Sequence, residues 1–375
     1  MPASAIRKLV PFADAAQNNG VKVYHLNVGA PDIKSPECAL EAVRKNTLDH
    51  VSYTNSAGLP ELRKGLAEKY YRSIGIDVSV PEIIVTVAGS EAVNLALQIA
   101  CDEGDELIVI EPFYTNYNTF CFESGIILKA VHTDIESGFK VPPIEEFEKL
   151  VTPRTKAILI SNPGNPTGTL YSKEDMLALG EVARKHNLFL ISDEVYREFC
   201  YTDEPHFSAM NIPGLADNVI LVDSVSKRYN LCGCRIGCIV SHLCPPVYGQ
   251  IASIGALDTP QSYFTEVRNE YVARRDYAVS RLNAMEGVYS PTPMGAFYTI
   301  ARIPVDDAEK FAKWMLTDFR LDGQTTMVTP AKSFYKTPGF GADQIRLAYV
   351  LGIPELEKAF DALEAGLKEY PGRTV

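Results

Sequence analysis

The chain has 375 residues, of which 46% are apolar and 22% are charged, and its formal net charge at pH 7 is -11. This length exceeds one ordinary hydrophobic core, so we expect one large domain and a smaller one. The negative charge argues against nucleic acid or an anionic membrane surface as a partner. No run of about 18 apolar residues indicates a membrane span.

The N-terminal stretch has no long apolar core, so we expect no signal peptide there. Apolar residues between positions 6 and 13 instead fit one face of a short amphipathic helix. The eight cysteines form no C-x-x-C pair, and the six histidines do not cluster near them. This spacing favours a reduced, cytoplasmic protein and gives no reason to expect a zinc site or any other metal.

Short β-rich runs alternate with helical patterns between about residues 80 and 240. We predict strands at 82–89, 105–112, 155–163, 188–194 and 218–224, with helices at 90–104 and 172–187. Because the strands are short, continuous and apolar, helices should cover both faces of the sheet. The alternation therefore predicts an α/β fold with a mostly parallel, doubly wound sheet.

Polar or glycine-rich residues follow each of these strands. They are Gly89-Ser90, Pro112 to Tyr114, Asn162 to Gly168, Asp193-Glu194 and Ser224 to Lys227. Ligands of such sheets lie beyond the carboxyl ends of the strands, so we expect these residues to meet in one cleft.

The pattern changes after about residue 285. Strands are predicted at 295–304, 327–334 and 343–351, with helices at 306–319 and 354–369. We therefore divide the chain into three parts: an N-terminal segment at 1–44, a large domain at 45–285, and a small α+β domain at 286–375. The N-terminal segment should pack with the small domain.

The most informative stretch is DSVSKRYNLCGCRIG, which runs from Asp223 to Gly237. Its Lys227 lies between hydroxyl residues and a glycine-rich turn, just past a predicted strand. A single lysine is usually a solvated surface charge. An amine beside a phosphate site, however, can act as a nucleophile towards an aldehyde. Ser224, Ser226 and Arg235 are suitable donors to such a phosphate.

This S-x-S-K segment, followed by G-x-R-x-G, resembles the cofactor-lysine segment of fold-type I pyridoxal-phosphate (PLP) enzymes, and above all the class I/II aminotransferases. The resemblance implies that Lys227 holds PLP as a Schiff base. It also implies that Ser224, Ser226 and Arg235 bind the phosphate. Asn230 stands where many members of the family have glycine.

Two further segments resemble the family in the same order along the chain. SNPGNPTG implies that Asn165 donates to the phenolic oxygen of the cofactor. SDEVYREF implies that Asp193 keeps the pyridine nitrogen protonated, so that the ring can accept electrons. The same segment implies that Tyr196 donates to the phenolic oxygen. Without the resemblance, SNPGNPTG is equally an ordinary tight turn, Asp193 a helix cap and Tyr196 an interfacial tyrosine.

The segments nearer the N-terminus also fit the family. VAGSEA implies phosphate donors at the start of a helix, at Gly89, Ser90 and Glu91, although an N-capping serine explains it equally well. EPFYTNY implies an aromatic residue stacked on the pyridine ring, for which we choose Tyr114 over Phe113.

Four residues are implied for substrate and partner. QIRLAYV places Arg346 in an apolar strand, where its fork would bind an α-carboxylate or form a structural salt bridge. LNVGAPD places the backbone of Gly29 near the same carboxylate, and Asn165 is expected to contact the substrate too. YTNSAGLPELR implies that Tyr53 reaches the phosphate of a second subunit, in a homodimer with shared sites.

The resemblance implies a PLP-dependent aminotransferase with a ping-pong mechanism through pyridoxamine phosphate, in which Lys227, Asp193 and Tyr196 carry the catalysis. We favour aspartate as the amino donor and a 2-oxo acid such as 2-oxoglutarate as the acceptor. No Arg or Lys lies between Ile236 and Val267, where one branch of the family binds the distal carboxylate. Another cation must therefore serve, or the substrate is a neutral or aromatic amino acid.

Three other functions stay open. A carbon–sulfur β-lyase would use the same cofactor residues. A nicotinamide dehydrogenase would share the doubly wound sheet, but no G-x-G-x-x-G follows any predicted strand. A non-catalytic regulator would carry a DNA-binding domain, for which this acidic chain offers no segment.

Overall fold

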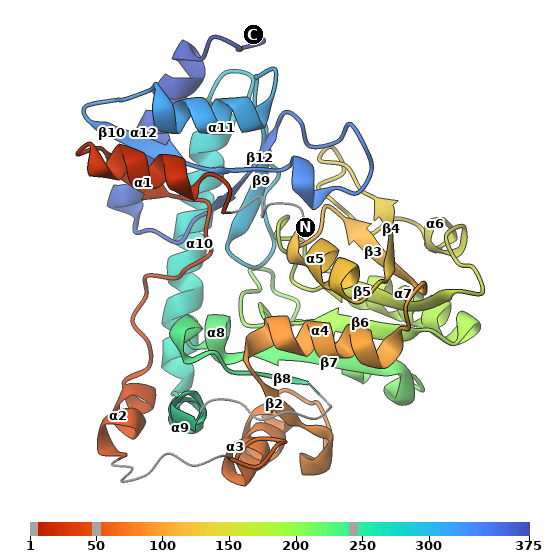
Figure 1. Ribbon diagram of the computed structural model, residues 1–375. Helices are drawn as coiled ribbons and strands as arrows, with labels where there is room; N and C mark the ends of the chain where they lie inside the picture. Colours follow the sequence, from red (N-terminus) through yellow and green to blue (C-terminus); the bar gives the residue numbers. More distant parts are fainter. Residues whose placement is uncertain (1–6, 47–53, 240–246) are drawn as a thin grey trace.

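The computed structural model describes residues 7–46, 54–239 and 247–375 (Figure 1). Its largest sheet has the strand order β2-β8-β7-β6-β5-β3-β4. In that order the strands are Ile84–Thr86, Gly237–Ile239, Val219–Ser224, Phe189–Asp193, Thr155–Ser161, Glu106–Glu111 and Ile127–His132.

The five strands from β7 to β4 run parallel, and β8 pairs antiparallel with both β2 and β7. The predicted mostly parallel sheet is confirmed. Two of its strands were not predicted. β4 has only two buried residues, Leu128 and Val131, and β8 has only three residues in all.

Helices cover both faces of this sheet, as the apolar strands predicted. They are α4 (Ala88–Ala100), α5 (Asn116–Glu123), α6 (Ile144–Glu148) and α7 (Lys173–His186). Leu107 and Val109 of β3 belong to the apolar cluster that contains α4. Ile108 and Ile110 of the same strand belong to the cluster that contains α7. This alternation along one strand is the signature of a doubly covered sheet.

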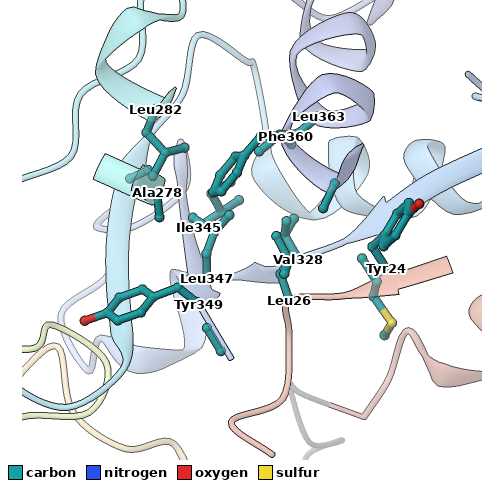
Figure 2. Packing of buried hydrophobic residues seen from close by; sticks show 14 of the residues in the cluster. Tyr24, Leu26, Ala278, Leu282, Val328, Ile345, Leu347, Tyr349, Phe360 and Leu363 are labelled. Atoms are coloured by element: carbon teal, nitrogen blue, oxygen red, sulfur yellow. The ribbon is translucent and has the colours of Figure 1, made fainter. Parts of the chain in front are cut away.

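The remaining strands form two small sheets. One is antiparallel in the order β11-β12-β9, with strands Thr329–Pro330, Gln344–Ala348 and Tyr298–Arg302. The other pairs β1 (Lys22–His25) in parallel with β10 (Gln324–Met327), so the start of the chain joins its C-terminal part. Figure 2 shows part of their shared core, in which Phe360 lies beside Ile345 and Leu26 lies beside Val328.

Three helices flank these small sheets: α1 (Val10–Asn18), α11 (Ala308–Thr317) and α12 (Ile353–Glu369). The first helix was expected over residues 6–13 but begins at Val10. Pro11 lies in its first turn, where the missing N–H of proline costs no hydrogen bond.

A long helix that was not predicted, α10 (Gln261–Ala284), runs between the large sheet and the small sheets and packs on α12 (Figure 1). The other helical segments are α2 (Glu37–Lys45), α3 (Pro60–Gly65), the π-helix η1 (Leu66–Tyr71), α8 (Val225–Arg228) and α9 (Val247–Ala256), with short 3-10 turns at 80–82, 209–211, 216–218, 232–234 and 332–334. Within the described ranges, no helix is long and apolar enough to cross a bilayer.

Candidate active site

The carboxyl ends of β5, β6 and β7 lie side by side. The backbone N–H of Asn162 donates to the Asp193 carbonyl over 3.0 Å, and that of Glu194 donates to the Val222 carbonyl over 2.9 Å. The start of α4 adjoins them, since a Cβ on Gly89 would lie 3.8 Å from the Ser224 Cβ. These contacts bring four of the five predicted strand ends to one edge of the sheet.

Lys227 lies in α8, directly after β7. Its Nζ donates to the Gly29 carbonyl over 2.8 Å and lies 3.6 Å from the Cys232 sulfur. The same ammonium lies 5.7 Å from the centre of the Phe297 ring. Among the described residues Lys227 has no carboxylate partner, so its amine is held by neutral acceptors.

The residues predicted to bind phosphate gather where β8 meets α4. The Ser224 Oγ lies 2.9 Å from both the Ser226 Oγ and the Ile236 carbonyl oxygen. A Cβ on Gly237 would lie 2.7 Å from the Gly89 nitrogen. The last glycine of G-x-R-x-G therefore allows the turn that carries Arg235 to approach the start of α4, whose free N–H groups suit an anion.

Three non-glycine residues near this turn adopt a left-handed backbone. They are Ala88 with φ 64°, Asn230 with φ 51° and Arg235 with φ 54°. Such conformations cluster at functional sites because the surrounding structure must impose them. Asparagine tolerates this region well, which explains how Asn230 replaces the glycine common in the family. The Arg235 side chain is exposed and donates to the Cys232 carbonyl over 2.9 Å.

The three residues of the predicted phosphate turn, Gly89, Ser90 and Glu91, lie in the first turn of α4. Ser90 is half-buried, and the Glu91 carboxylate accepts the N–H of Val87, so Glu91 caps its own helix. Tyr53 lies outside the described residues.

Asp193 is a buried carboxylate without an ionic partner among the described residues. The Tyr117 hydroxyl donates to its Oδ2 over 2.8 Å, and the Val195 N–H lies 3.4 Å from its Oδ1. Burial raises the pKa of Asp193 to about 6, although both hydrogen bonds oppose that rise. A buried carboxylate of this kind fits a cationic N–H, which is what the protonated ring nitrogen of PLP offers.

Two aromatic residues adjoin Asp193. Tyr117, which was not predicted, lies one helical turn after Tyr114 in the sequence YTNY, and this spacing could have indicated it. The two rings meet edge to face at 5.6 Å. Phe113 is buried in the core beside α4, whereas Tyr114 is partly exposed. This difference supports Tyr114 as the ring that faces a ligand.

Arg346 is buried to 1% exposure between two rings, 4.6 Å from the centre of Tyr298 and 5.1 Å from that of Phe334. Its Nη1 donates to the Asn165 Oδ1 over 3.1 Å, and its Nη2 donates to the Asn27 carbonyl. Its Nε has no partner within the described part of the chain. The alternative of a structural salt bridge fails there, because no carboxylate pairs with this guanidinium. Burial lowers the pKa of Arg346.

Tyr196 and Tyr298 form a buried pair whose hydroxyl oxygens are 3.2 Å apart. Burial, reinforced by Tyr298, raises the pKa of Tyr196 well above its ordinary value. Gly29 is in close contact with Tyr298, since a Cβ there would lie 1.7 Å from the Tyr298 hydroxyl. Only glycine fits at position 29 with Tyr298 in this place. Nothing in the sequence indicated Tyr298.

Behind Lys227 lies a buried ion cluster that was also not predicted. Arg228 donates to both carboxylate oxygens of Asp223 and, over 2.9 Å, to Glu198. Its guanidinium lies 3.6 Å from the centre of the Tyr70 ring. Since Arg228 follows Lys227 directly and Asp223 precedes Ser224, this cluster holds both ends of the lysine segment.

The comparisons with known proteins agree on one family. Residues 21–363 match the model of aminotransferase class I and II. The aspartate aminotransferase of Thermotoga maritima is 32% identical over 97% of this chain and 96% of its own length. The aspartate/prephenate aminotransferase of Thermus thermophilus is 32% identical over 95% of this chain and 96% of its own.

Solved structures give the same result. The aspartate aminotransferase from Thermus thermophilus with maleate has a TM-score of 0.88 at 30% identity, covering 98% of this chain and 97% of that one. The alanine aminotransferase from Pyrococcus furiosus has a TM-score of 0.88 at 31% identity, covering 98% of both chains.

Proposed function

Because the chain belongs to the class I and II aminotransferases, and so is a PLP-dependent transferase of fold type I, we propose that it moves the amino group of aspartate to a 2-oxo acid such as 2-oxoglutarate. The family does not favour the β-lyase, dehydrogenase and regulator alternatives. Aspartate is supported by the names of the Thermotoga and Thermus relatives.

One observation carries the proposal for the site. The segment from Asn27 to Gly29 accepts hydrogen bonds from both Arg346 and Lys227. Three consecutive residues thereby fix the Arg346 guanidinium, which suits an α-carboxylate, relative to the Lys227 amine, which suits an imine. This is the arrangement that an α-amino acid requires, because its carboxylate and amino group share one carbon.

Bound PLP supplies an aldehyde carbon that takes up the amino group and a ring that accepts electrons from the substrate Cα. In our proposal Arg346 binds the α-carboxylate, and the amine of Lys227, once released, moves the proton from Cα. Asp193 keeps the ring nitrogen protonated, while Asn165 and Tyr196 donate to the phenolic oxygen. Tyr114 covers one face of the ring and so excludes water.

The phosphate would be held at the junction of α4 and β8, by the backbone of Gly89 and Ser90 and by Ser224, Ser226 and Arg235. We propose that Tyr53 of a second copy completes this site in a homodimer. The exposed Arg235 side chain supports this, since it leaves the phosphate end accessible to another subunit. We further propose a cytoplasmic location, consistent with seven described cysteines that are all free.

We propose Arg7 as the cation that binds the side-chain carboxylate of aspartate. Burial raises the pKa of Tyr114 to about 12, and the charges of Arg346 and Arg7 both act against that rise. The Arg7 charge therefore acts on the residue proposed to cover the cofactor. Arg7 is exposed at the turn before α1 and has no ion pair among the described residues. Its neighbour Lys8, in contrast, pairs with Glu309.

A half-reaction screen tests the substrate. Aspartate, glutamate, alanine and phenylalanine are each added alone to the PLP-loaded enzyme, and the fall of the cofactor's visible absorbance is followed. We expect aspartate to react fastest. Arg7→Gln should lower kcat/KM for aspartate by about tenfold or more and leave alanine unchanged, while Lys8→Gln changes neither. If alanine or phenylalanine reacts and both acidic amino acids fail, aspartate is not the substrate.

A further inference from the structure

Tyr298 touches three parts of the site at once. It lies on β9 opposite Ala348 of β12 and is 3% exposed. Its hydroxyl lies 3.2 Å from that of Tyr196 and fills the space that a side chain at Gly29 would need. Its ring lies 4.6 Å from the Arg346 guanidinium carbon.

We propose that Tyr298 is a positioning residue with two separable roles. Its hydroxyl donates to Tyr196, so that Tyr196 can donate to the cofactor. Its ring holds Arg346 in place for the substrate carboxylate. The proposal rests on the roles given above to Tyr196 and Arg346.

The hydroxyl part follows from counting hydrogens. A phenol has one hydrogen to donate and lone pairs that accept. If Tyr196 donates its hydrogen to the phenolic oxygen of PLP, the contact with Tyr298 can only be a bond that Tyr196 accepts. Tyr298 then donates, and a donor that itself accepts a hydrogen bond becomes stronger. Gly29 makes this geometry possible, since any larger residue would displace the Tyr298 hydroxyl.

The ring part follows from the surroundings of Arg346. Its guanidinium carbon lies 4.6 Å from the centre of the Tyr298 ring and 5.1 Å from that of Phe334, and its Nε has no partner among the described residues. Attraction between a cation and an aromatic face is strongest where water is excluded, as it is here. The ring therefore helps to hold the Arg346 guanidinium at its position in the site.

Phenylalanine and leucine at position 298 separate the two parts. Tyr298→Phe keeps the ring and removes only the hydroxyl, whereas Tyr298→Leu removes both. Tyr349→Phe is the matched control, because Tyr349 is buried in the same cluster and its hydroxyl lies 3.4 Å from the Ala296 carbonyl. Denaturant unfolding of each variant checks that the fold is retained.

The readout for the hydroxyl is the pH titration of the bound cofactor's visible absorbance. A donor to the phenolic oxygen stabilises the form in which the nitrogen bound to Lys227 has lost its proton, so a weaker donor raises the midpoint. We expect Tyr298→Phe to raise it by about 0.5 pH unit. Tyr196→Phe should raise it more, and the double variant should match Tyr196→Phe, because Tyr298 acts through Tyr196.

The readout for the ring is the division between KM and kcat. Tyr298→Leu should raise KM for the amino donor by about tenfold, while Tyr298→Phe leaves it unchanged. The proposal would be overturned if the midpoint of Tyr298→Phe does not move, or if the shifts of the single variants add up in the double variant. It would also be overturned if Tyr298→Leu and Tyr298→Phe have equal KM values. The titration needs no substrate, so a failure of aspartate to react would overturn the proposed function alone.

Discussion

The backbone N–H of Lys336 donates to the buried carboxylate of Glu111 over 2.6 Å, although the two residues are 225 positions apart. The N–H of Thr337 donates to the same oxygen over 2.9 Å. Glu111 ends β3, so its carboxylate fastens the segment after β11 to the large sheet. That segment also carries Phe334, whose ring packs on Arg346.

We expect Glu111→Ala to release this segment. Amide exchange at Lys336 and Thr337 should accelerate by roughly ten- to a hundredfold, because hydrogen bonds to a charged acceptor contribute about 1.5–3 kcal/mol. KM for the amino donor should rise, since Phe334 would hold Arg346 less firmly. Hydrogen-exchange mass spectrometry and steady-state kinetics measure the two effects.

Two variants serve as controls for Glu111. Glu111→Gln keeps an oxygen that can accept both N–H groups. The amides of Lys336 and Thr337 should therefore exchange more slowly in this variant than in Glu111→Ala. Glu136→Ala removes the exposed ion pair with Arg302 and should have little effect, because exposed pairs contribute little. Equal exchange rates in wild type and Glu111→Ala would show that the carboxylate does not hold the segment.

The buried, ionised carboxylate of Asp193 should destabilise the folded state of the cofactor-free protein at neutral pH. Burial raises its pKa from 3.8 to about 6, so the folded state binds the proton more tightly than the unfolded state. The cofactor-free wild type should therefore lose stability as pH rises from about 4 to 6 on account of this group, by up to about 3 kcal/mol. Asp193→Asn should be more stable at pH 7, and the gain should vanish near pH 4.

Chemical denaturation of the cofactor-free proteins at both pH values measures this, with exposed Asp203→Asn as the control. PLP should bind Asp193→Asn more weakly, because the neutral amide no longer complements a ring cation. If Asp193→Asn is less stable than the wild type at pH 7, other groups in the folded chain already offset the cost of burying the Asp193 charge.

Arg228 should be essential to stability. Burial alone would raise the pKa of Asp223, but the Arg228 and Arg197 guanidiniums lower it below its ordinary value. Arg228→Met leaves Asp223 and Glu198 without their main cation and should cost about 3–5 kcal/mol at pH 7. Because the buried Asp223 carboxylate can then take up a proton, the loss should shrink as pH falls towards 5. Arg44→Met, which removes an exposed pair with Glu37, should change unfolding by less than about 1 kcal/mol. A loss for Arg228→Met that is the same at pH 5 and pH 7 would contradict this view of the cluster.

The sequence predicted the large sheet and its ligand edge because parallel strands place their carboxyl ends together, whatever the distance along the chain. It also indicated Lys227, Asp193 and Arg346, since each interrupts or follows an apolar strand. It did not predict their mutual contacts. Gly29 and Lys227 are 198 positions apart, and nothing in local periodicity relates them.

The residues that were missed share one physical reason. Tyr298 and Tyr117 are aromatic residues in apolar surroundings, where core packing is the ordinary expectation. Only the positions of their hydroxyls, on Tyr196 and Asp193, give them a further role. The long helix α10 was missed because its 24 residues mix buried and exposed positions without a strong apolar face.

Covalent attachment of PLP to Lys227 can be measured directly. The protein is loaded with PLP, reduced with borohydride, digested, and the labelled peptide is mapped by mass spectrometry, with Lys227→Ala treated in parallel. We expect one label, on Lys227, in the wild type, and neither a label nor transamination in the variant. A label on another lysine, or a Lys227→Ala enzyme that still transaminates at the wild-type rate, would contradict the account.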